Sequence, residues 1–351
     1  MKITLERILL VKRRPLTISR GTSASSENLI VTVEQDGIVG IGEMAPVDIG
    51  DGREDAEYAE RQLTETAPDL EYIQPWEMQR VERVLADHIV CKSAQAALDF
   101  ALHDWLGKKS GMPLYRLLGA DPVSIVPTSL TIGINPPDVA RDHAAEILSR
   151  LEPQSLKVKL GSSDGIEADK EMLQAVMSVT PPNVKIRVDA NGGWSVNDAL
   201  KMLPWLAEWC VEYVEQPLPI GHEGELSALY LDSPIPIFAD ESCRTADDIW
   251  KLKDRVHGVN LKLMKCGGIR EGLRLIHTAR SAGLKVMMGC MSETSLSIAA
   301  GAHLSPLVDY LDLDSHLNLN PDPFVGLQWS DGRVMVGDAN GLGINWANRT
   351  E

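Results

Sequence analysis

Paired cysteines are missing from this sequence. Its five cysteines stand singly at positions 91, 210, 243, 266 and 290, and no two of them form a CxxC pair. This spacing favours neither a zinc site nor a disulfide framework. Because free thiols persist in a reducing compartment, we expect a cytoplasmic protein.

Positive charge and long apolar runs are also scarce. The chain has 34 lysines and arginines against 50 acidic residues, a formal net charge of −16. A nucleic-acid-binding surface needs clustered positive charge, which this balance argues against. No apolar stretch is long enough to cross a membrane. The segment MKITLERILLVKRR carries its basic residues after its short apolar run, which is typical of a first strand rather than a signal peptide. We therefore expect neither nucleic acid nor membrane as a partner.

The second part of the chain has a regular rhythm. The 351 residues suit one large barrel plus a smaller domain. After about residue 125, short apolar runs alternate with segments of helical periodicity, which predicts βαβ units and a parallel sheet. Eight such runs predict a closed (β/α) barrel. They are VPTSLTIG, SLKVKLG, KIRVDAN, VEYVEQP, IPIFADE, GVNLKLMK, KVMMGC and YLDLDS.

The flanking segments predict an α+β domain. ENLIVTVEQDGIVGIGE alternates apolar and polar residues around Asp36-Gly37, as a β-hairpin does. SAQAALDFALHDWLGKKSG predicts a helix that stops at its glycine. The tail GLQWSDGRVMVGDANGLGINW predicts a second hairpin that returns to the first domain. We expect an N-terminal domain over 1–122, joined by the tail 323–351, and a barrel over 123–322.

Three predicted strands end in carboxylates. Asp189, Glu215 and Asp240 are separated by steps of 26 and 25 residues, about one βα unit each. Since barrel strands gather their C-terminal ends on one rim, these side chains should be neighbours. Converging carboxylates need a hard divalent cation, and oxygen-only ligation favours Mg²⁺, with Mn²⁺ as the alternative. Asn191 and Glu241 either face away or hold the ligands in place.

Lysines flank this acidic centre. In SLKVKLG, Lys157 and Lys159 point the same way because strand side chains alternate. Lys262 lies one strand beyond Asp240, on the other side of the predicted ion. Lysine is a poor base at its reference pKa of about 10.4. We expect a second ammonium and the metal to lower the pKa of one lysine, so that it serves as a general base.

At these residues the chain resembles the muconate-lactonizing subgroup of the enolase superfamily. The matching stretches are LKVKLG (156–161), RVDANGGW (187–194), VEQP (214–217), ADES (239–242) and NLKLMKCGG (260–268). GIGEMAP (40–46) and ALHDWLGKKSGMPLYRLLG (101–119) extend the resemblance over nearly the whole chain. It implies an α+β capping domain on a (β/α)7β barrel.

The resemblance also implies a role for each matching residue. One Mg²⁺ per subunit would be held by Asp189, Glu215 and Asp240. Lys159 and Lys262 would be the acid/base pair that removes and returns a proton α to a carboxylate, as lysine bases do with magnesium in this superfamily. Lys157 would be an electrostatic helper. Lys265 lies outside the catalytic position and is expected to support the ligands.

The eighth strand discriminates among the reactions of the subgroup. LDLDSH puts Asp312 and Asp314 on one face by the period-2 rule. This pair resembles that of the dipeptide epimerases, where it binds the free α-ammonium of the substrate, and two carboxylates suit a cationic amine. The alternative is an N-acylamino-acid racemase or o-succinylbenzoate synthase, whose substrate would leave the pair uncompensated. A non-catalytic barrel should have lost a ligand or a lysine. A phosphate-binding barrel should have glycine after the seventh strand, where MSETSLS has none.

The side-chain specificity of the dipeptide is a separate question. Arg20, in LTISRGT, falls where the capping loop resembles that of the L-Ala-D/L-Glu epimerases, in which an arginine meets the glutamate carboxylate. Asp48 and Asp51 would instead favour a cationic side chain. Met291, Ser292 and Glu293 are expected to border the substrate. We expect a small-molecule dipeptide substrate and a homo-oligomeric enzyme.

Overall fold

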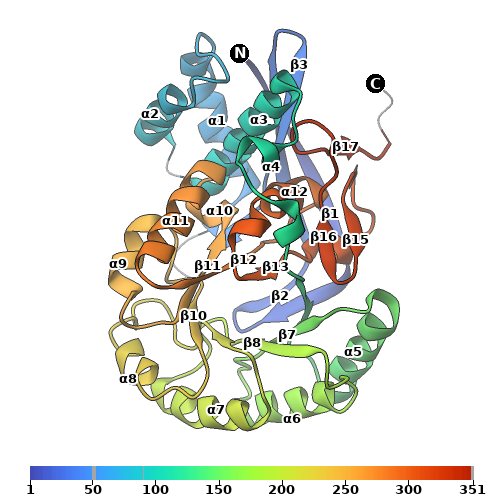
Figure 1. The fold of residues 1–351 in the computed structure, drawn as a ribbon, viewed down its shortest axis with the longest axis vertical. Coiled ribbons are helices and arrows are strands. Elements are labelled where there is room, and N and C mark those ends of the chain that lie inside the picture. The colour runs from blue at the N-terminus through green and yellow to red at the C-terminus, as the bar shows by residue number, and fades with distance from the viewer. Residues whose placement is uncertain (50–52, 90, 349–351) are drawn as a thin grey trace.

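The computed structural model describes residues 1–49, 53–89 and 91–348, and its N-terminal part is an antiparallel sheet covered by helices (Figure 1). The strands are β1 (Lys2–Ile18), β2 (Gly21–Gln35) and β3 (Ile38–Met44), in that order. Both residues of the β2–β3 turn have positive φ, 55° at Asp36 and 71° at Gly37. A two-residue hairpin turn requires this conformation, so the predicted hairpin is confirmed.

Helices pack on one side of this sheet. They are α1 (Ala56–Leu70), α2 (Met78–His88) and α3 (Lys92–Ser110), followed by α4 (Leu114–Leu117). The predicted alanine-rich helix is α3, and it ends at Gly111 in the left-handed conformation with φ 66°. Two short strands, β4 (Val47–Asp48) and β5 (Arg53–Glu54), follow β3 in the sequence and precede α1.

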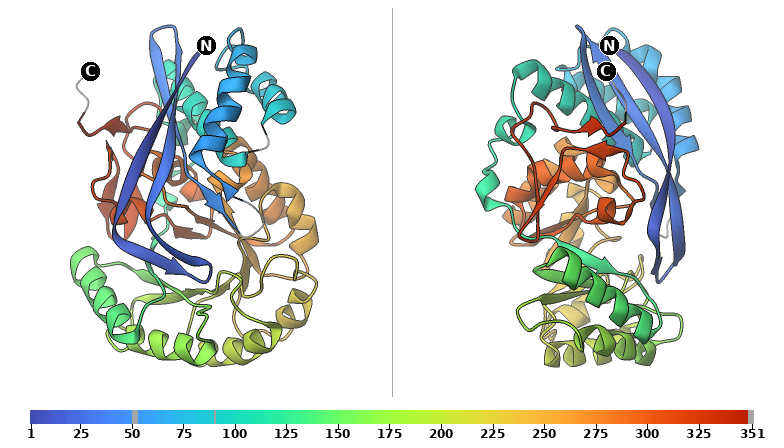
Figure 2. Two further views of the ribbon diagram at one scale, coloured as in Figure 1. Left: turned by 180° about the vertical axis from the view of Figure 1, so that it is seen from behind. Right: turned by 90° about the vertical axis from the view of Figure 1, so that its right-hand side faces the viewer.

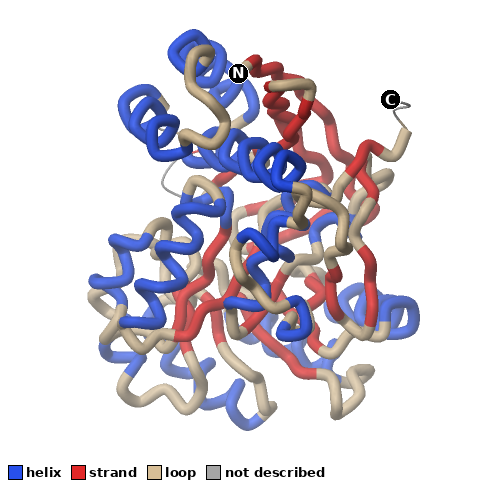
Figure 3. Tube along the Cα trace, turned by 45° about the horizontal axis from the view of Figure 1, so that its top comes forward, coloured by secondary structure: helices blue, strands red, loops and turns tan. Residues whose placement is uncertain are grey.

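Eight parallel strands form the second part, in the order β6 to β13 (Figures 1 and 3). A parallel bridge between Thr128 and Leu311 joins the first and last strands, so the sheet closes as predicted. The strands are β6 (Ser129–Ile132), β7 (Ser155–Lys159), β8 (Lys185–Asp189), β9 (Val214–Glu215), β10 (Ile237–Ala239), β11 (Gly258–Lys262), β12 (Lys285–Gly289) and β13 (Tyr310–Asp312). The eight apolar runs of the sequence are these eight strands.

Helices surround the strands on the outside (Figure 1). They are α5 (Pro137–Leu151), α6 (Ile166–Met177), α7 (Val196–Glu208), α8 (Leu226–Tyr230), α9 (Ile249–Leu252), α10 (Leu263–Cys266), α11 (Ile269–Ser281) and α12 (Ser295–Leu304). The described residues also contain the 3-10 turns η1 (Pro122–Ser124), η2 (Ala246–Asp248), η3 (Ser305–Leu307) and η4 (Ser315–Asn318). The architecture is therefore a (β/α)7β barrel with an α+β capping domain. No helix within the described ranges is both long and apolar enough to span a bilayer.

The C-terminal tail contacts both parts of the protein. It contains β14 (Phe324–Val325), β15 (Gln328–Ser330), β16 (Arg333–Met335) and β17 (Asn345–Trp346), and β15 with β16 is the predicted hairpin. This hairpin contacts the barrel instead of the capping domain, because the Trp329 indole donates to the carbonyl of Leu151 at 3.0 Å. The later segment around Leu342 reaches the capping domain. The buried carboxylate of Asp104, on α3, accepts N–H bonds from Ile41 at 3.0 Å and from Leu342 at 2.8 Å. His303, on α12, accepts the N–H of Tyr115 at 3.2 Å and contacts the carbonyl of Leu342 at 3.2 Å.

The β1–β2 hairpin extends beyond its own domain and lies across the barrel (Figure 2). At its tip, the Ser19 hydroxyl donates to the carbonyl of Asn191, in the loop after β8, at 2.8 Å. The hairpin therefore brings capping-domain side chains to the rim that holds the C-terminal ends of the strands, where barrel chemistry is located.

Candidate active site

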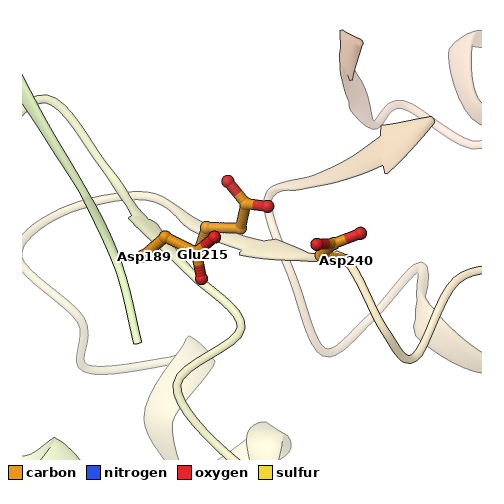
Figure 4. A group of neighbouring side chains, drawn as sticks. All are labelled: Asp189, Glu215 and Asp240. Atoms are coloured by element: carbon orange, nitrogen blue, oxygen red, sulfur yellow. The ribbon is translucent and has the colours of Figure 1, made fainter. Parts of the chain in front are cut away.

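Three buried carboxylates converge at the C-terminal rim of the barrel (Figure 4). Asp189 and Glu215 end β8 and β9, and Asp240 directly follows β10. All three are fully buried, and one oxygen from each lies within 4.8 Å of the others. The predicted convergence is confirmed. Such an all-oxygen set suits a hard cation such as Mg²⁺.

Two lysines approach this cluster from opposite strands. The Lys159 ammonium, from the end of β7, lies 2.6 Å from an oxygen of Asp189. The Lys262 ammonium, from the end of β11, lies 2.6 Å from an oxygen of Asp240. Both side chains are nearly buried. Each lysine therefore flanks one outer carboxylate of the cluster, with Glu215 on the strand between them.

Lys157 lies deeper in the barrel and joins the cluster to the last strand. Its ammonium is fully buried, 2.6 Å from Glu215, 2.6 Å from Asp312 and 3.5 Å from Asp189. Burial alone would lower the pKa of Lys157, but Asp312, Glu215 and Asp189 together raise it well above its ordinary value. At Lys157, three carboxylates thus outweigh the neighbouring ammonium. The lowered pKa that we predict for one lysine includes the effect of a bound metal ion and stays a prediction.

The same balance of burial and neighbouring charge shifts the pKa values of Lys262 and Glu215. Burial lowers the pKa of Lys262, but Asp240, Glu215 and Glu241 raise it above the ordinary lysine value. Burial and then the charge of Asp189 raise the pKa of Glu215 to about 8, against the opposing effect of Lys157. A divalent cation among the carboxylates would stabilise the ionised form of Glu215 and compete with the lysines for the carboxylate oxygens.

Neighbouring side chains hold the three carboxylates in place. Lys265 donates to an Asp240 oxygen at 2.5 Å, to the carbonyl of Cys243 at 2.9 Å and to the carbonyl of Asn260 at 3.1 Å. Asn191 donates to Asp189 at 3.1 Å and to Glu241 at 3.2 Å. Asn191 and Lys265 thus contact the cluster from outside, and Glu241 contacts Asn191.

Two supporting residues were missed by the sequence reasoning. The Asn260 amide donates to Glu215 at 2.6 Å, and the Gln216 amide oxygen accepts the backbone N–H of Asp240 at 2.8 Å. Asn260 stands two residues before Lys262 in β11, so strand periodicity could have placed it on the same inner face. The position of Gln216, in VEQP, carries no such signal.

Asp312 and Asp314 are not equivalent. The strand ends at Asp312, and Asp314 begins the turn into η4, so only Asp312 lies within the strand. Asp312 is held by Lys157 and by the Ser129 hydroxyl at 2.7 Å. Asp314 accepts the N–H of Thr131 at 2.6 Å and is partly exposed. Burial and the charge of Asp312 raise the pKa of Asp314 to about 7. Asp314 is therefore the more accessible of the two.

The capping loop places Arg20 over the cluster. Its guanidinium lies 2.8 Å from the buried carboxylate of Glu241 and donates to the carbonyl of Asn191 at 3.0 Å. Arg20 is thus already paired with an acid of the barrel. Asp48 is exposed, and its backbone carbonyl accepts a 3.5 Å bond from Arg20; Asp51 lies outside the described residues.

The loop after β12 contains the remaining predicted contacts. Glu293 is buried, and its carboxylate accepts the N–H of Met291 at 2.7 Å. Burial and the charge of Glu43 raise the pKa of Glu293 to about 8, while Lys262 lowers it. The carbonyl of Ser292 accepts a bond from Asn28, in the capping domain, at 2.9 Å.

Comparisons with known proteins agree with this geometry. Residues 3–119 match the family model described as "Mandelate racemase / muconate lactonizing enzyme, N-terminal domain", and residues 139–350 match "Enolase C-terminal domain-like". A hydrophobic dipeptide epimerase of Roseobacter litoralis is 47% identical over 350 residues, covering 98% of each chain. An L-Ala-D/L-Glu epimerase of Bacteroides thetaiotaomicron is 35% identical over 349 residues, covering 98% of this chain and 88% of the other.

A solved structure shares the whole fold. It is a dipeptide epimerase from Enterococcus faecalis, complexed with Mg and L-Leu-L-Tyr. The TM-score is 0.91 at 32% identity, and 98% of each chain is covered.

Proposed function

Since this chain belongs to the mandelate racemase / muconate lactonizing enzyme family, within the enolase superfamily, we propose that it is a Mg²⁺-dependent dipeptide epimerase. The observation that carries the proposal is the pair of lysines, Lys159 and Lys262, placed on opposite sides of a buried carboxylate cluster. Inverting one carbon by proton transfer needs a base on one face and an acid on the other. A lone lysine could exchange that proton without inverting the carbon.

Asp189, Glu215 and Asp240 would hold one Mg²⁺, which stabilises negative charge on the substrate carboxylate when bound. Lys159 and Lys262 carry out the proton transfer: one removes the α-proton, and the other, as the ammonium, donates a proton to the opposite face. Their roles exchange in the reverse direction. Lys157 would keep positive charge beneath the reacting carboxylate.

The substrate would be a dipeptide with a free amine, and its C-terminal residue would be the one inverted. That residue has the free carboxylate that a metal can bind, and its α-proton is adjacent to it. The amine then lies one residue away, near the eighth strand, where Asp312 and Asp314 supply negative charge. An N-acylated amino acid, the substrate class of the alternative reaction, lacks this cation.

The pairing of Arg20 bears on which C-terminal side chain the enzyme accepts. The predicted L-Ala-D/L-Glu specificity requires its guanidinium to meet an acidic side chain, but Arg20 is paired with Glu241 at 2.8 Å. This pairing favours an uncharged, apolar C-terminal residue. The 47% and 46% identical relatives are named hydrophobic dipeptide epimerases, which supports the same candidate.

One comparison tests the function and its specificity. L-Ala-L-Glu, L-Ala-L-Phe and L-Ala-L-Lys are incubated in D₂O with Mg²⁺ or with EDTA, and deuterium at the α-carbon is read by mass. We expect exchange only with Mg²⁺. Preference for the phenylalanine dipeptide would select the apolar specificity, and preference for the lysine dipeptide would point to the acids at Asp48 and Asp51. No exchange with any free dipeptide would refute the proposed function.

We further propose that the enzyme acts in peptide metabolism in the cytoplasm as a homo-oligomer, with domains dividing at 122/123 and the tail from 323. Three of the five cysteines, Cys91, Cys243 and Cys266, are buried free thiols, which suits a reducing compartment. Light scattering coupled to size exclusion measures the oligomeric state.

A further inference from the structure

The segment GIGEMAP is not explained by the metal cluster or the lysines. Its two glycines pack β3 against α3: a Cβ at Gly40 would lie 2.1 Å from the carbonyl oxygen of Ala101, and one at Gly42 would lie 2.0 Å from that of Ala97. Only glycine allows this approach of strand to helix. The close packing fixes the position of β3, and therefore of the next side chain, Glu43.

Glu43 is a fully buried carboxylate that reaches from the capping domain into the barrel. It accepts the backbone N–H of Thr294 at 3.1 Å, the hydroxyl of Thr294 at 2.7 Å and the N–H of Ser297 at 3.3 Å. These groups form the first turn of α12 (Ser295–Leu304). A carboxylate at the N-terminus of a helix satisfies free N–H groups and complements the helix dipole.

Asn28 completes the contact from the neighbouring strand. Its amide donates to Glu43 at 2.7 Å and to the carbonyl of Ser292 at 2.9 Å. Glu43 and Asn28 thus hold both ends of the segment 292–297. Inside that segment is Glu293, whose carboxyl is affected by the charges of both Glu43 and Lys262.

Asn28 also lies on the strand that leads to the hairpin tip. β2 begins at Gly21, next to Ser19 and Arg20, which bind the loop after β8. One hairpin therefore contacts the barrel rim at two places, through Ser19 and Arg20 at one and through Asn28 with Glu43 at the other. A shift at either contact would move the capping loop relative to the loop after β12.

We propose that Glu43, together with Asn28, is a positioning residue that sets the 291–294 loop against the capping hairpin and so determines how tightly the substrate is bound. This inference rests on the proposed function for its kinetic consequence, since we expect the loop to border the dipeptide. The Glu43 carboxylate contacts Asn28, Thr294 and Ser297, so it would act on the substrate through this loop.

The test is Glu43→Gln, which keeps the size of the side chain but directs an NH₂ group at donors. We expect the amides of Thr294 and Ser297 to exchange with deuterium at least about tenfold faster, because glutamine offers one acceptor oxygen where the carboxylate offers two. We also expect KM for the preferred dipeptide to rise about tenfold, with little change in kcat and none in Mg²⁺ affinity. Asn28→Ala should produce the same pattern and serves if Glu43→Gln does not fold.

Asp99→Asn is the matched control. Asp99 is also a capping-domain carboxylate at the start of a barrel helix, and it accepts the N–H of Ile269 at 2.6 Å. Its variant should loosen α11 and leave exchange in 292–297 and KM unchanged. The proposal is overturned if Glu43→Gln and Asn28→Ala lower the melting temperature but leave KM unchanged, or if they slow kcat alone. Hydrogen exchange needs no substrate. An inactive wild-type enzyme would therefore refute the proposed function, while the exchange rates in 292–297 would still test the positioning role of Glu43.

Discussion

Replacing Lys157 with methionine removes one buried positive charge while keeping the length of the side chain. The ammonium is fully buried between Glu215, Asp312 and Asp189. Removing one partner of a buried ion pair typically costs about 3–5 kcal/mol, because the remaining charge is left unpaired. We expect a loss of that size in the free energy of unfolding when the protein is held in EDTA. With Mg²⁺ the loss should fall below half, because the ion supplies the missing counter-charge.

Urea unfolding at pH 7.5, followed by circular dichroism in EDTA and in Mg²⁺, measures both values. Lys170→Met is the control: Lys170 pairs with Glu167 at 2.8 Å, but Glu167 is 76% exposed. A surface pair of that kind contributes about 0–1 kcal/mol. A loss below about 1 kcal/mol for Lys157→Met in EDTA, or an equal loss with and without Mg²⁺, would contradict the view that Lys157 neutralises the carboxylate cluster.

Three further outcomes are expected. Lys159→Ala and Lys262→Ala should each stop net epimerisation, measured by chiral chromatography. Either variant can still exchange the α-proton of one epimer. Undiminished epimerisation by both variants would exclude the two-lysine scheme. N-acetylation of the dipeptide should lower kcat/KM at least about tenfold, since each charge-assisted bond contributes about 1.5–3 kcal/mol. Asp314→Asn should weaken binding of the free dipeptide more than binding of the acetylated one. Equal turnover of the free and the acetylated dipeptide would favour an N-acylamino-acid racemase. Burial lowers the pKa of His303 from 6.5 to about 4, so the unfolded chain binds a proton at this residue before the folded one does as the pH falls. About 3 kcal/mol in the free energy of unfolding should therefore be lost between pH 7 and pH 4. A His303→Gln variant with the same pH dependence in urea unfolding would contradict this.

The barrel could be predicted because its signals are local. Each strand is a short apolar run, and the period of two residues places Lys157 and Lys159 on one face. The regular steps between Asp189, Glu215 and Asp240 follow from the length of a βα unit. These patterns need no knowledge of distant contacts.

The features that the sequence could not reveal have a different physical origin. The end of β13 at Asp312 is set by the turn into η4, which the alternating pattern continues past. The raised pKa of Lys157 depends on carboxylates from three other strands, so no single stretch reveals it. The pairing of Arg20 with Glu241 joins two domains, and the capping action of Glu43 on α12 spans 251 residues. Contacts of this range leave no periodic signal in the sequence.

The carboxylate of Asp104 has a consequence for synthesis of the chain on the ribosome. It binds the N–H of Ile41 and that of Leu342, which lies 238 residues further along. At about 5–20 residues per second, a ribosome needs roughly 12–48 seconds to cover that distance. Throughout that interval the nascent capping domain contains β3 and α3 but lacks the segment around Leu342, whose N–H binds the second oxygen of Asp104. The packing around Asp104 is therefore completed only when the last part of the polypeptide emerges, and a chain that stops before residue 342 leaves this buried oxygen without its N–H donor.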